Sequence, residues 1–125
     1  MVMKYYKIVY GYGQEEYISI TTNELPKAIA LFMQGSGRTT FNTGAIRGQD
    51  IMRIVPDYHK ALGWNKGYKI TAEDSREIAP LEKEYDKTYD KAKLIAEYSI
   101  KQNTPEILSQ NPQEVYLKIA PKVLS

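Results

Sequence analysis

The start of the chain alternates apolar and polar residues with the period of a β-strand. This alternation runs from Lys4 to Tyr12 and again from Glu16 to Thr21, with turn-forming residues from Gly11 to Gln14 between them. The pattern predicts an antiparallel hairpin. Its expected core face consists of Tyr6, Ile8, Tyr10, Ile18 and Ile20. Its opposite face would carry Tyr5, Lys7, Tyr17 and Ser19.

A helical pattern follows the hairpin. Thr22 is a typical N-cap residue, Pro26 falls in the first turn, where its missing N–H costs little, and Gly35 is a typical C-terminal stop. We therefore predict a helix between Thr22 and Gly35, packed on the sheet through an apolar stripe. The stripe consists of Leu25, Ile29, Phe32 and Met33.

Short strand patterns separated by glycine turns occupy the next stretch. We predict strands over Thr39 to Asn42, Ala45 to Arg47 and Asp50 to Val55, with Pro56 ending the last one. This last strand is apolar on both faces, which predicts a central position in the sheet with cover on each side. The residues concerned are Ile51 and Val55 on one face and Met52 and Ile54 on the other.

The stretch after Pro56 has the composition of a capped turn. Asp57 can cap a short helical turn from Tyr58 to Leu62, which Gly63 would close. Gly67 allows a further bend, and Tyr68 to Ile70 is the last candidate strand.

The second half of the chain is helical. Thr71 followed by Asp74 predicts a capping box at the start of a long helix, and Pro80 predicts a stop or a kink after the first two turns. The apolar stripe of this helix is Leu81, Tyr85, Tyr89, Ala92, Ile95 and Ala96, with Leu94 and Tyr98 beside it. Two cap-then-proline pairs, at Thr104 and Asn111, predict short C-terminal helices. These would bury Leu108, Val115, Leu117 and Ile119.

These patterns together predict an α+β fold: a small antiparallel β-sheet with one packed helix, followed by a long helix and short C-terminal helices. The 125 residues form a single domain, mainly β with one helix over 1–71 and helical over 72–125. The chain has no cysteine, no apolar run long enough for a membrane helix and no signal-peptide pattern. We expect a cytoplasmic protein that does not enter a membrane.

Charge and tyrosine content change this picture in one respect. Residues 1–71 hold nine lysines and arginines against five acidic residues, whereas residues 72–102 hold six against eight. Either a basic face exists in the first part, or the acidic helix packs beside it and cancels its field. Tyrosine is unusually frequent, with 11 residues, and tyrosines suit half-buried strand surfaces and interfaces.

No motif of known chemistry is present. Asp57 could orient His59 for general-base catalysis, but residues two apart on a helical turn diverge, and a cap and a surface residue explain the pair as well. One histidine without cysteine makes a metal site improbable, and the glycines match no phosphate-binding fingerprint. We therefore predict a non-enzymatic protein without a metal or cofactor.

Two groups of residues are candidates for binding. The outer hairpin face, with Tyr5, Lys7 and Tyr17, could stack on bases while basic residues meet phosphates. These basic residues are Arg47, Arg53 and Lys60. A second group lies in and before the glycine-flanked loop, where aromatic and basic residues could anchor a protein partner or, in the case of Trp64, tuck into the core. It consists of Tyr58, His59, Lys60, Trp64, Lys66 and Tyr68.

The stretch from Ile51 to Asn65, with Tyr68-Lys69 after it, resembles small bacteriophage- and prophage-encoded proteins of unassigned role. The similarity extends back through Tyr5-Tyr6-Lys7 and the Leu25 helix, about the first 75 residues. It implies a mobile-element origin and supplies no catalytic residues. By analogy with such proteins, we expect a binding protein that blocks or sequesters a factor of the bacterial host, for example an anti-defence inhibitor. The alternative is a nucleic-acid or nucleotide-binding module that uses the basic, tyrosine-bearing face.

Leu94 and Tyr98 also bear on assembly. This second ridge on the long helix could meet a copy of itself across a two-fold axis, which predicts a homodimer. Alternatively, the C-terminal helices cover the ridge within one chain.

Overall fold

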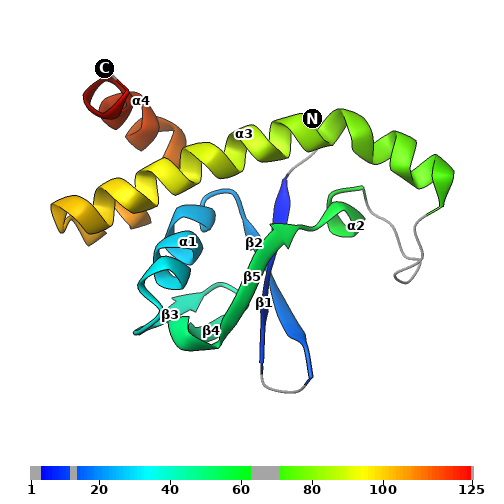
Figure 1. Cartoon of the computed structure of the whole chain (residues 1–125), viewed down its shortest axis with the longest axis horizontal. Helices are drawn as coiled ribbons and strands as arrows, with labels where there is room; N and C mark the ends of the chain where they lie inside the picture. Colours follow the sequence, from blue (N-terminus) through cyan, green and yellow to red (C-terminus); the bar gives the residue numbers. More distant parts are fainter. Residues whose placement is uncertain (1–3, 12–13, 63–70, 125) are drawn as a thin grey trace.

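The computed structural model describes residues 4–11, 14–62 and 71–124, and these have an α+β fold, as the sequence predicts (Figure 1). The strands are β1 (Tyr5–Tyr10), β2 (Glu16–Thr21), β3 (Arg38–Phe41), β4 (Gly44–Arg47) and β5 (Ile51–Pro56). The α-helices are α1 (Leu25–Gln34), α2 (Tyr58–Ala61), α3 (Ala72–Gln102) and α4 (Pro112–Val123). Two 3₁₀ helices, η1 (Gly48–Asp50) and η2 (Pro105–Ser109), complete the described elements. The predicted loop and strand over residues 63–70 lie outside the described residues.

The main sheet is antiparallel and has the order β2-β1-β5. The predicted hairpin of β1 and β2 is confirmed, and its core face is buried at Tyr6, Ile8 and Ile20. The prediction of a central β5 is wrong for the described strands, among which β1 is central and β5 lies at an edge.

A β-bulge explains why β5 is apolar on both faces. The pairing with β1 skips Met52, since Val9 pairs with Arg53 while Tyr10 pairs with Ile51. In a regular strand, residues three apart point to opposite faces. The extra residue shifts this alternation by one, so Ile51 and Ile54 both reach the core. Met52 itself is 47% exposed. The odd spacing therefore marks a bulge and not a strand covered on both sides.

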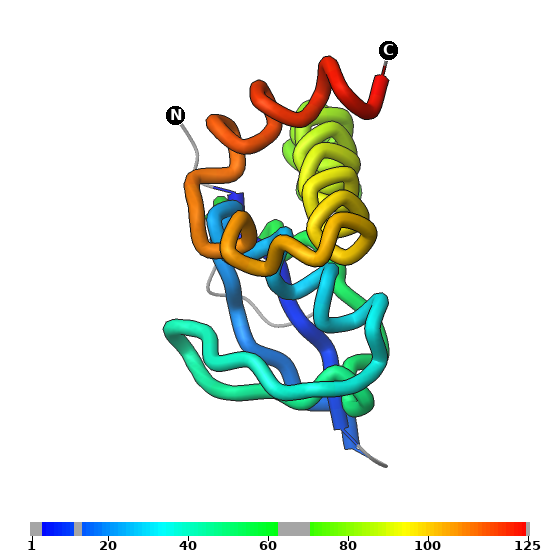
Figure 2. Tube along the Cα trace, turned by 90° about the vertical axis from the view of Figure 1, so that its left-hand side faces the viewer, coloured from blue at the N-terminus to red at the C-terminus, as the bar shows by residue number. Residues whose placement is uncertain are grey.

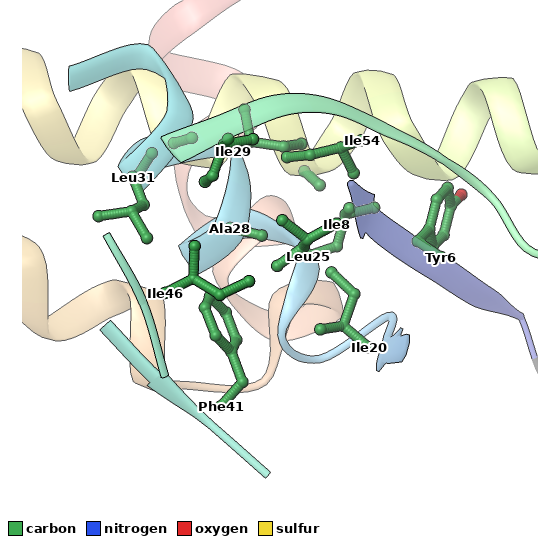
Figure 3. Close-up of a cluster of buried hydrophobic side chains, with 14 of the residues drawn as sticks. Tyr6, Ile8, Ile20, Leu25, Ala28, Ile29, Leu31, Phe41, Ile46 and Ile54 are labelled. Carbon is green, nitrogen blue, oxygen red and sulfur yellow. The ribbon is translucent and has the colours of Figure 1, made fainter. Parts of the chain in front are cut away.

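The strands β3 and β4 form a separate two-stranded sheet. The prediction that they belong to one small sheet with the other strands is therefore wrong. Their turn is fixed to the main sheet by Thr43, whose hydroxyl donates to the carbonyl oxygen of Ser19 at 2.9 Å. Figure 3 shows Phe41 and Ile46 of this hairpin pointing toward Leu25 and Ala28 of α1. The second hairpin thus closes one end of the core.

The helix α1 differs from its prediction in its first residues and in its buried face. It begins at Leu25, and Glu24, not Thr22, holds the N-cap position. The Glu24 side chain makes no cap hydrogen bond. One of its carboxylate oxygens accepts from the Asn42 N–H at 2.9 Å. Its predicted stop is confirmed, since Gly35 has φ 66°. Phe32 and Met33 are 37% and 47% exposed, against prediction. The buried face is Leu25, Ala28, Ile29, Ala30 and Leu31. This face includes Leu31 because η1 packs against that end of α1. The Gly48 N–H fixes η1 there by donating to the Gly37 carbonyl at 2.9 Å.

The long helix α3 lies between two layers. Figures 1 and 2 show α4 on one side of α3, with α1 and the main sheet on the other. The capping box is confirmed: the Thr71 hydroxyl accepts from the Asp74 N–H and the Asp74 carboxylate accepts from the Thr71 N–H. The helix continues through Pro80, and its green first turns are inclined to the rest in Figure 1. The predicted stripe is buried at Tyr85, Ala92, Ile95 and Ala96, while Leu81 and Tyr89 pack at the edge of the core.

A second, smaller cluster joins α3 to α4. Its buried members are Ile95, Val115 and Ile119, and Leu94 and Tyr98 pack against them. The ridge from which the sequence analysis predicted a homodimer is therefore covered within one chain, so it lends a dimer no support. Asn111 caps α4 as predicted, but Leu117 is 73% exposed and not buried. Within the described part of the chain, no helix combines the length and the apolar character that a membrane crossing requires.

Candidate functional site

The face of the main sheet turned away from α1 gathers the aromatic and basic side chains of the predicted binding face. We call it the outer sheet face. Because side chains alternate along a strand, the residues that are out of phase with Tyr6, Ile8 and Ile20 share it. It consists of Tyr5, Lys7 and Val9 of β1, Tyr17 and Ser19 of β2, and Arg53 of β5, with Lys60 of α2 at one end.

Two lysines on this face lie over two tyrosine rings. The Lys7 ammonium is 4.7 Å from the ring centroid of Tyr17, and the Lys60 ammonium is 4.8 Å from that of Tyr5. Both distances are within the range of cation–π attraction. Tyr17 is 48% exposed, so its ring remains open to a ligand. The face therefore presents two aromatic rings, each next to a positive charge.

A bidentate ion pair lies at the other end of the face. The Arg53 guanidinium donates to both carboxylate oxygens of Glu15, at 3.2 and 3.0 Å. These hydrogen bonds lower the pKa of the Glu15 carboxyl. Arg53 pairs with Val9 across the strands, and Val9 is buried although it lies on the outer side. Glu15 partly neutralises this end, so the positive charge of the face is concentrated at the lysines.

The position of Lys60 follows from the cap of α2. One Asp57 carboxylate oxygen accepts from the Lys60 N–H at 3.2 Å, and the other accepts from the Ser19 hydroxyl at 3.3 Å. Asp57 also donates its N–H to the Tyr5 carbonyl at 2.8 Å. The predicted cap is confirmed, and both oxygens of this buried carboxylate have structural partners. The structure thus gives Asp57 an anchoring role next to the face, and His59 follows it on α2 as a half-buried residue.

The predicted site residues separate into three sets. The structure brings Tyr5, Tyr17, Arg53 and Lys60 together on the outer sheet face. Tyr58 points toward the core instead, with its ring 5.0 Å from that of Tyr85, and burial raises its pKa. Arg47 lies on β4, outside the main sheet, and donates to Asp50 at 3.0 Å. Trp64, Lys66 and Tyr68 lie outside the described residues.

Lys7 lies on this face with Tyr5 and Tyr17, as the hairpin pattern predicts. Its register opposite Ser19 puts it between the two tyrosines. The sequence did not indicate that Lys7 lies over the Tyr17 ring, since that contact depends on the pairing register. Among the described residues, no group of three or more histidine, aspartate or glutamate side chains could hold a metal ion.

Comparison of the chain with protein-family models, with curated proteins and with solved structures finds no match.

Proposed function

We propose that the protein is a non-enzymatic binding protein that holds a short stretch of single-stranded nucleic acid on the outer sheet face. The observation that carries the proposal is the alternation of aromatic rings and cations along one sheet surface. Tyr17 pairs with Val9, four residues from Tyr5 on β1, which separates the two rings by roughly 13 Å along the strand. Lys7 lies between them, where a phosphate would link stacked bases.

The expected energies favour a change of partner, in which each lysine leaves its tyrosine ring for a phosphate and a base stacks on the ring. An exposed cation–π contact contributes about 0.5–1 kcal/mol, whereas stacking of one base on an aromatic ring contributes about 1–3 kcal/mol. A phosphate that attracts the Lys7 ammonium would uncover the Tyr17 ring for a base. The same exchange applies to Lys60 and Tyr5.

The test is fluorescence anisotropy with labelled single-stranded DNA and RNA over a range of salt concentrations. If Lys7 and Lys60 each meet one phosphate, log K should fall with log salt with a slope of about −1.4, and Lys7→Ala should reduce its magnitude by about 0.7. Tyr17→Ala should weaken binding roughly 5- to 150-fold, whereas Tyr17→Phe should retain it. Lys101→Ala, on an exposed part of α3, is the matched control. Absence of binding at low salt, or binding unaffected by Tyr17→Ala, would refute the proposal.

A second candidate is the binding of a host protein, which the resemblance to phage and prophage proteins implies. The Arg53–Glu15 pair favours it, because an acidic group on the face repels phosphates but suits a protein surface of mixed charge. Pull-down from nuclease-treated bacterial lysate, with Arg53→Ala and Tyr17→Ala as comparisons, separates the candidates. A host protein retained by the wild type and lost with both variants, without nucleic-acid binding, would support this candidate and exclude the first.

A further inference from the structure

A groove of about 650 Å³ lies between Lys4, the β2–α1 turn, α3 and α4. Its size falls within the roughly 300–1,000 Å³ of small-molecule sites. The lining residues come from four separate parts of the chain, and the most polar among them are Lys4, Thr22, Asn23, Thr88, Lys91 and Gln113. No carboxylate belongs to the described lining, whereas two lysines do.

The two lysines flank one point on α3. The Lys4 ammonium forms an ion pair, at 4.0 Å, with the Glu84 carboxylate, one turn before Thr88, and Lys91 lies about one turn after Thr88. The Glu84 side chain is 64% exposed, and a phosphate in the groove would replace it as the partner of Lys4. Seven residues of helix separate Glu84 from Lys91, about 10 Å, which is within the combined reach of two lysine side chains. A phosphate beside α3 at the level of Thr88 would thus lie between the positions of Lys4 and Lys91.

The first turn of α4 adds no free anion site to this groove. The Asn111 side chain already accepts from the N–H groups of Gln113 and Glu114, at 2.9 and 3.4 Å. The charge of the groove therefore comes from Lys4 and Lys91. Because these are side-chain charges, single substitutions can remove them without disturbing the helix cap.

An aromatic ring forms one wall beside the cations. Tyr116 of α4 lines the groove, and the Lys91 ammonium lies 5.1 Å from its ring centroid. Tyr116 is held in place because it packs against the cluster of Ile95, Val115 and Ile119. A planar ring next to a phosphate site is the arrangement that a nucleotide base requires.

We propose that this groove binds a small phosphorylated ligand of the nucleoside monophosphate class, with its phosphate between Lys4 and Lys91 and its base against Tyr116. The groove shares none of the tyrosines and basic residues that define the outer sheet face. A single strand on the sheet and a mononucleotide in the groove are therefore independent binding events.

The test is titration of the isotope-labelled full chain with the common ribonucleoside 5′-monophosphates, followed by amide chemical shifts and by calorimetry. Adenosine and inorganic phosphate, each alone, serve as half-ligand probes. We expect saturable binding, with shifts at Thr22, Asn23, Thr88 and Lys91. Lys4→Gln and Lys91→Gln should each weaken it roughly tenfold, because each removes a charge-assisted hydrogen bond.

Lys118→Gln is the matched control, since this exposed lysine lies on α4 outside the groove lining. Lys118→Gln and Tyr17→Ala should both retain mononucleotide binding, and thermal unfolding of every variant verifies that it is folded. Three results would overturn the proposal: binding that does not saturate at millimolar ligand, wild-type affinity in the folded Lys4→Gln and Lys91→Gln variants, or chemical-shift changes confined to the outer sheet face. Inorganic phosphate binding as tightly as the nucleotides would overturn the assignment of Tyr116 to a base.

Discussion

The Tyr6 hydroxyl donates a hydrogen bond to the main-chain carbonyl oxygen of Tyr85 at 2.9 Å, and the Tyr85 hydroxyl accepts one from the Tyr5 N–H at 3.1 Å. The two rings also pack against each other, with 5.1 Å between their centroids. These contacts join β1 to α3 across 79 and 80 residues of sequence. A shift of α3 by one turn would break both bonds, so the pair fixes the position of the helix along the sheet.

The Tyr85 hydroxyl should contribute more to the free energy of unfolding than the Tyr6 hydroxyl. Tyr85→Phe leaves the part-buried Tyr5 N–H without its acceptor, and we expect a loss of about 1–3 kcal/mol in the free energy of unfolding. Tyr6→Phe removes the donor to the Tyr85 carbonyl and the side-chain hydrogen bond with Thr88. The Tyr85 carbonyl can keep its bond within the helix and the Thr88 hydroxyl is only half-buried, so the loss should be about 0.5–1.5 kcal/mol. Urea unfolding measures both. A Tyr6→Phe loss that exceeds the Tyr85→Phe loss would contradict this ranking.

Stability should fall in strongly alkaline solution. Burial raises the pKa of five tyrosines above the ordinary value near 10, namely Tyr6, Tyr10, Tyr58, Tyr85 and Tyr89. Below pH 10 both the folded and the unfolded chain keep these phenols protonated, so they contribute no pH dependence. Above pH 10 the unfolded chain loses protons that the folded chain retains, which favours unfolding by up to about 1.4 kcal/mol per pH unit for each tyrosine.

Denaturant midpoints between pH 8 and pH 11.5 test this expectation. The midpoint should be flat at first and then decline, and Tyr6→Phe should make the decline shallower, because that side chain no longer titrates. A midpoint that rises above pH 10 would show that the sign is wrong.

Two glycines should resist substitution for different reasons. A Cβ at Gly48 would lie 2.7 Å from the Leu31 carbonyl oxygen and 2.9 Å from two main-chain atoms of Ser36. Gly48→Ala must therefore separate η1 from α1, with an expected cost of about 1–3 kcal/mol. Gly35 has open space around it, and its left-handed φ is the only obstacle. Gly35→Ala should cost about 1 kcal/mol and Gly35→Asn less. Thermal unfolding distinguishes the two sites. Gly35→Asn should be more stable than Gly35→Ala, whereas Gly48→Asn should be no more stable than Gly48→Ala.

The cap of α2 should matter for both stability and the outer sheet face. Asp57→Ala removes the acceptor of the Lys60 N–H and of the Ser19 hydroxyl, with an expected loss of about 0.5–2 kcal/mol. Asp57→Asn keeps an acceptor oxygen and should retain most of this stability. Unfolding in urea measures the loss, and anisotropy shows whether the displaced Lys60 also weakens binding. Equal losses for Ala and Asn would show that the cap is not the cause.

The parts of the fold that the sequence predicts are those fixed by neighbours along the chain. The β1–β2 alternation, the Thr71–Asp74 box, the Asn111 cap and the Gly35 stop all depend on a few adjacent residues. The errors at Thr22 and at Phe32 and Met33 arise from distant contacts, because Glu24 bonds Asn42 and η1 packs near Leu31. The order of strands likewise depends on long-range pairing, which no local pattern in β5 reveals.

The candidate site follows the same division. Tyr5, Tyr17, Arg53 and Lys60 share a face because strand alternation and a local cap place them, and both are readable from the sequence. Arg47 is excluded because β3 and β4 leave the main sheet, a tertiary event. The groove of Lys4, Lys91 and Tyr116 could not be predicted, since it joins the start of β1 to two helices far along the chain.

The bulge at Met52 also affects the tendency of the protein to aggregate. A free edge strand offers main-chain donors and acceptors on which another chain can add a strand. In β5 the extra residue bends that edge and Pro56 at its end carries no N–H, so an incoming strand would find an irregular row of partners. The same residue that brings Ile51 and Ile54 into the core therefore makes the edge a poor template for aggregation.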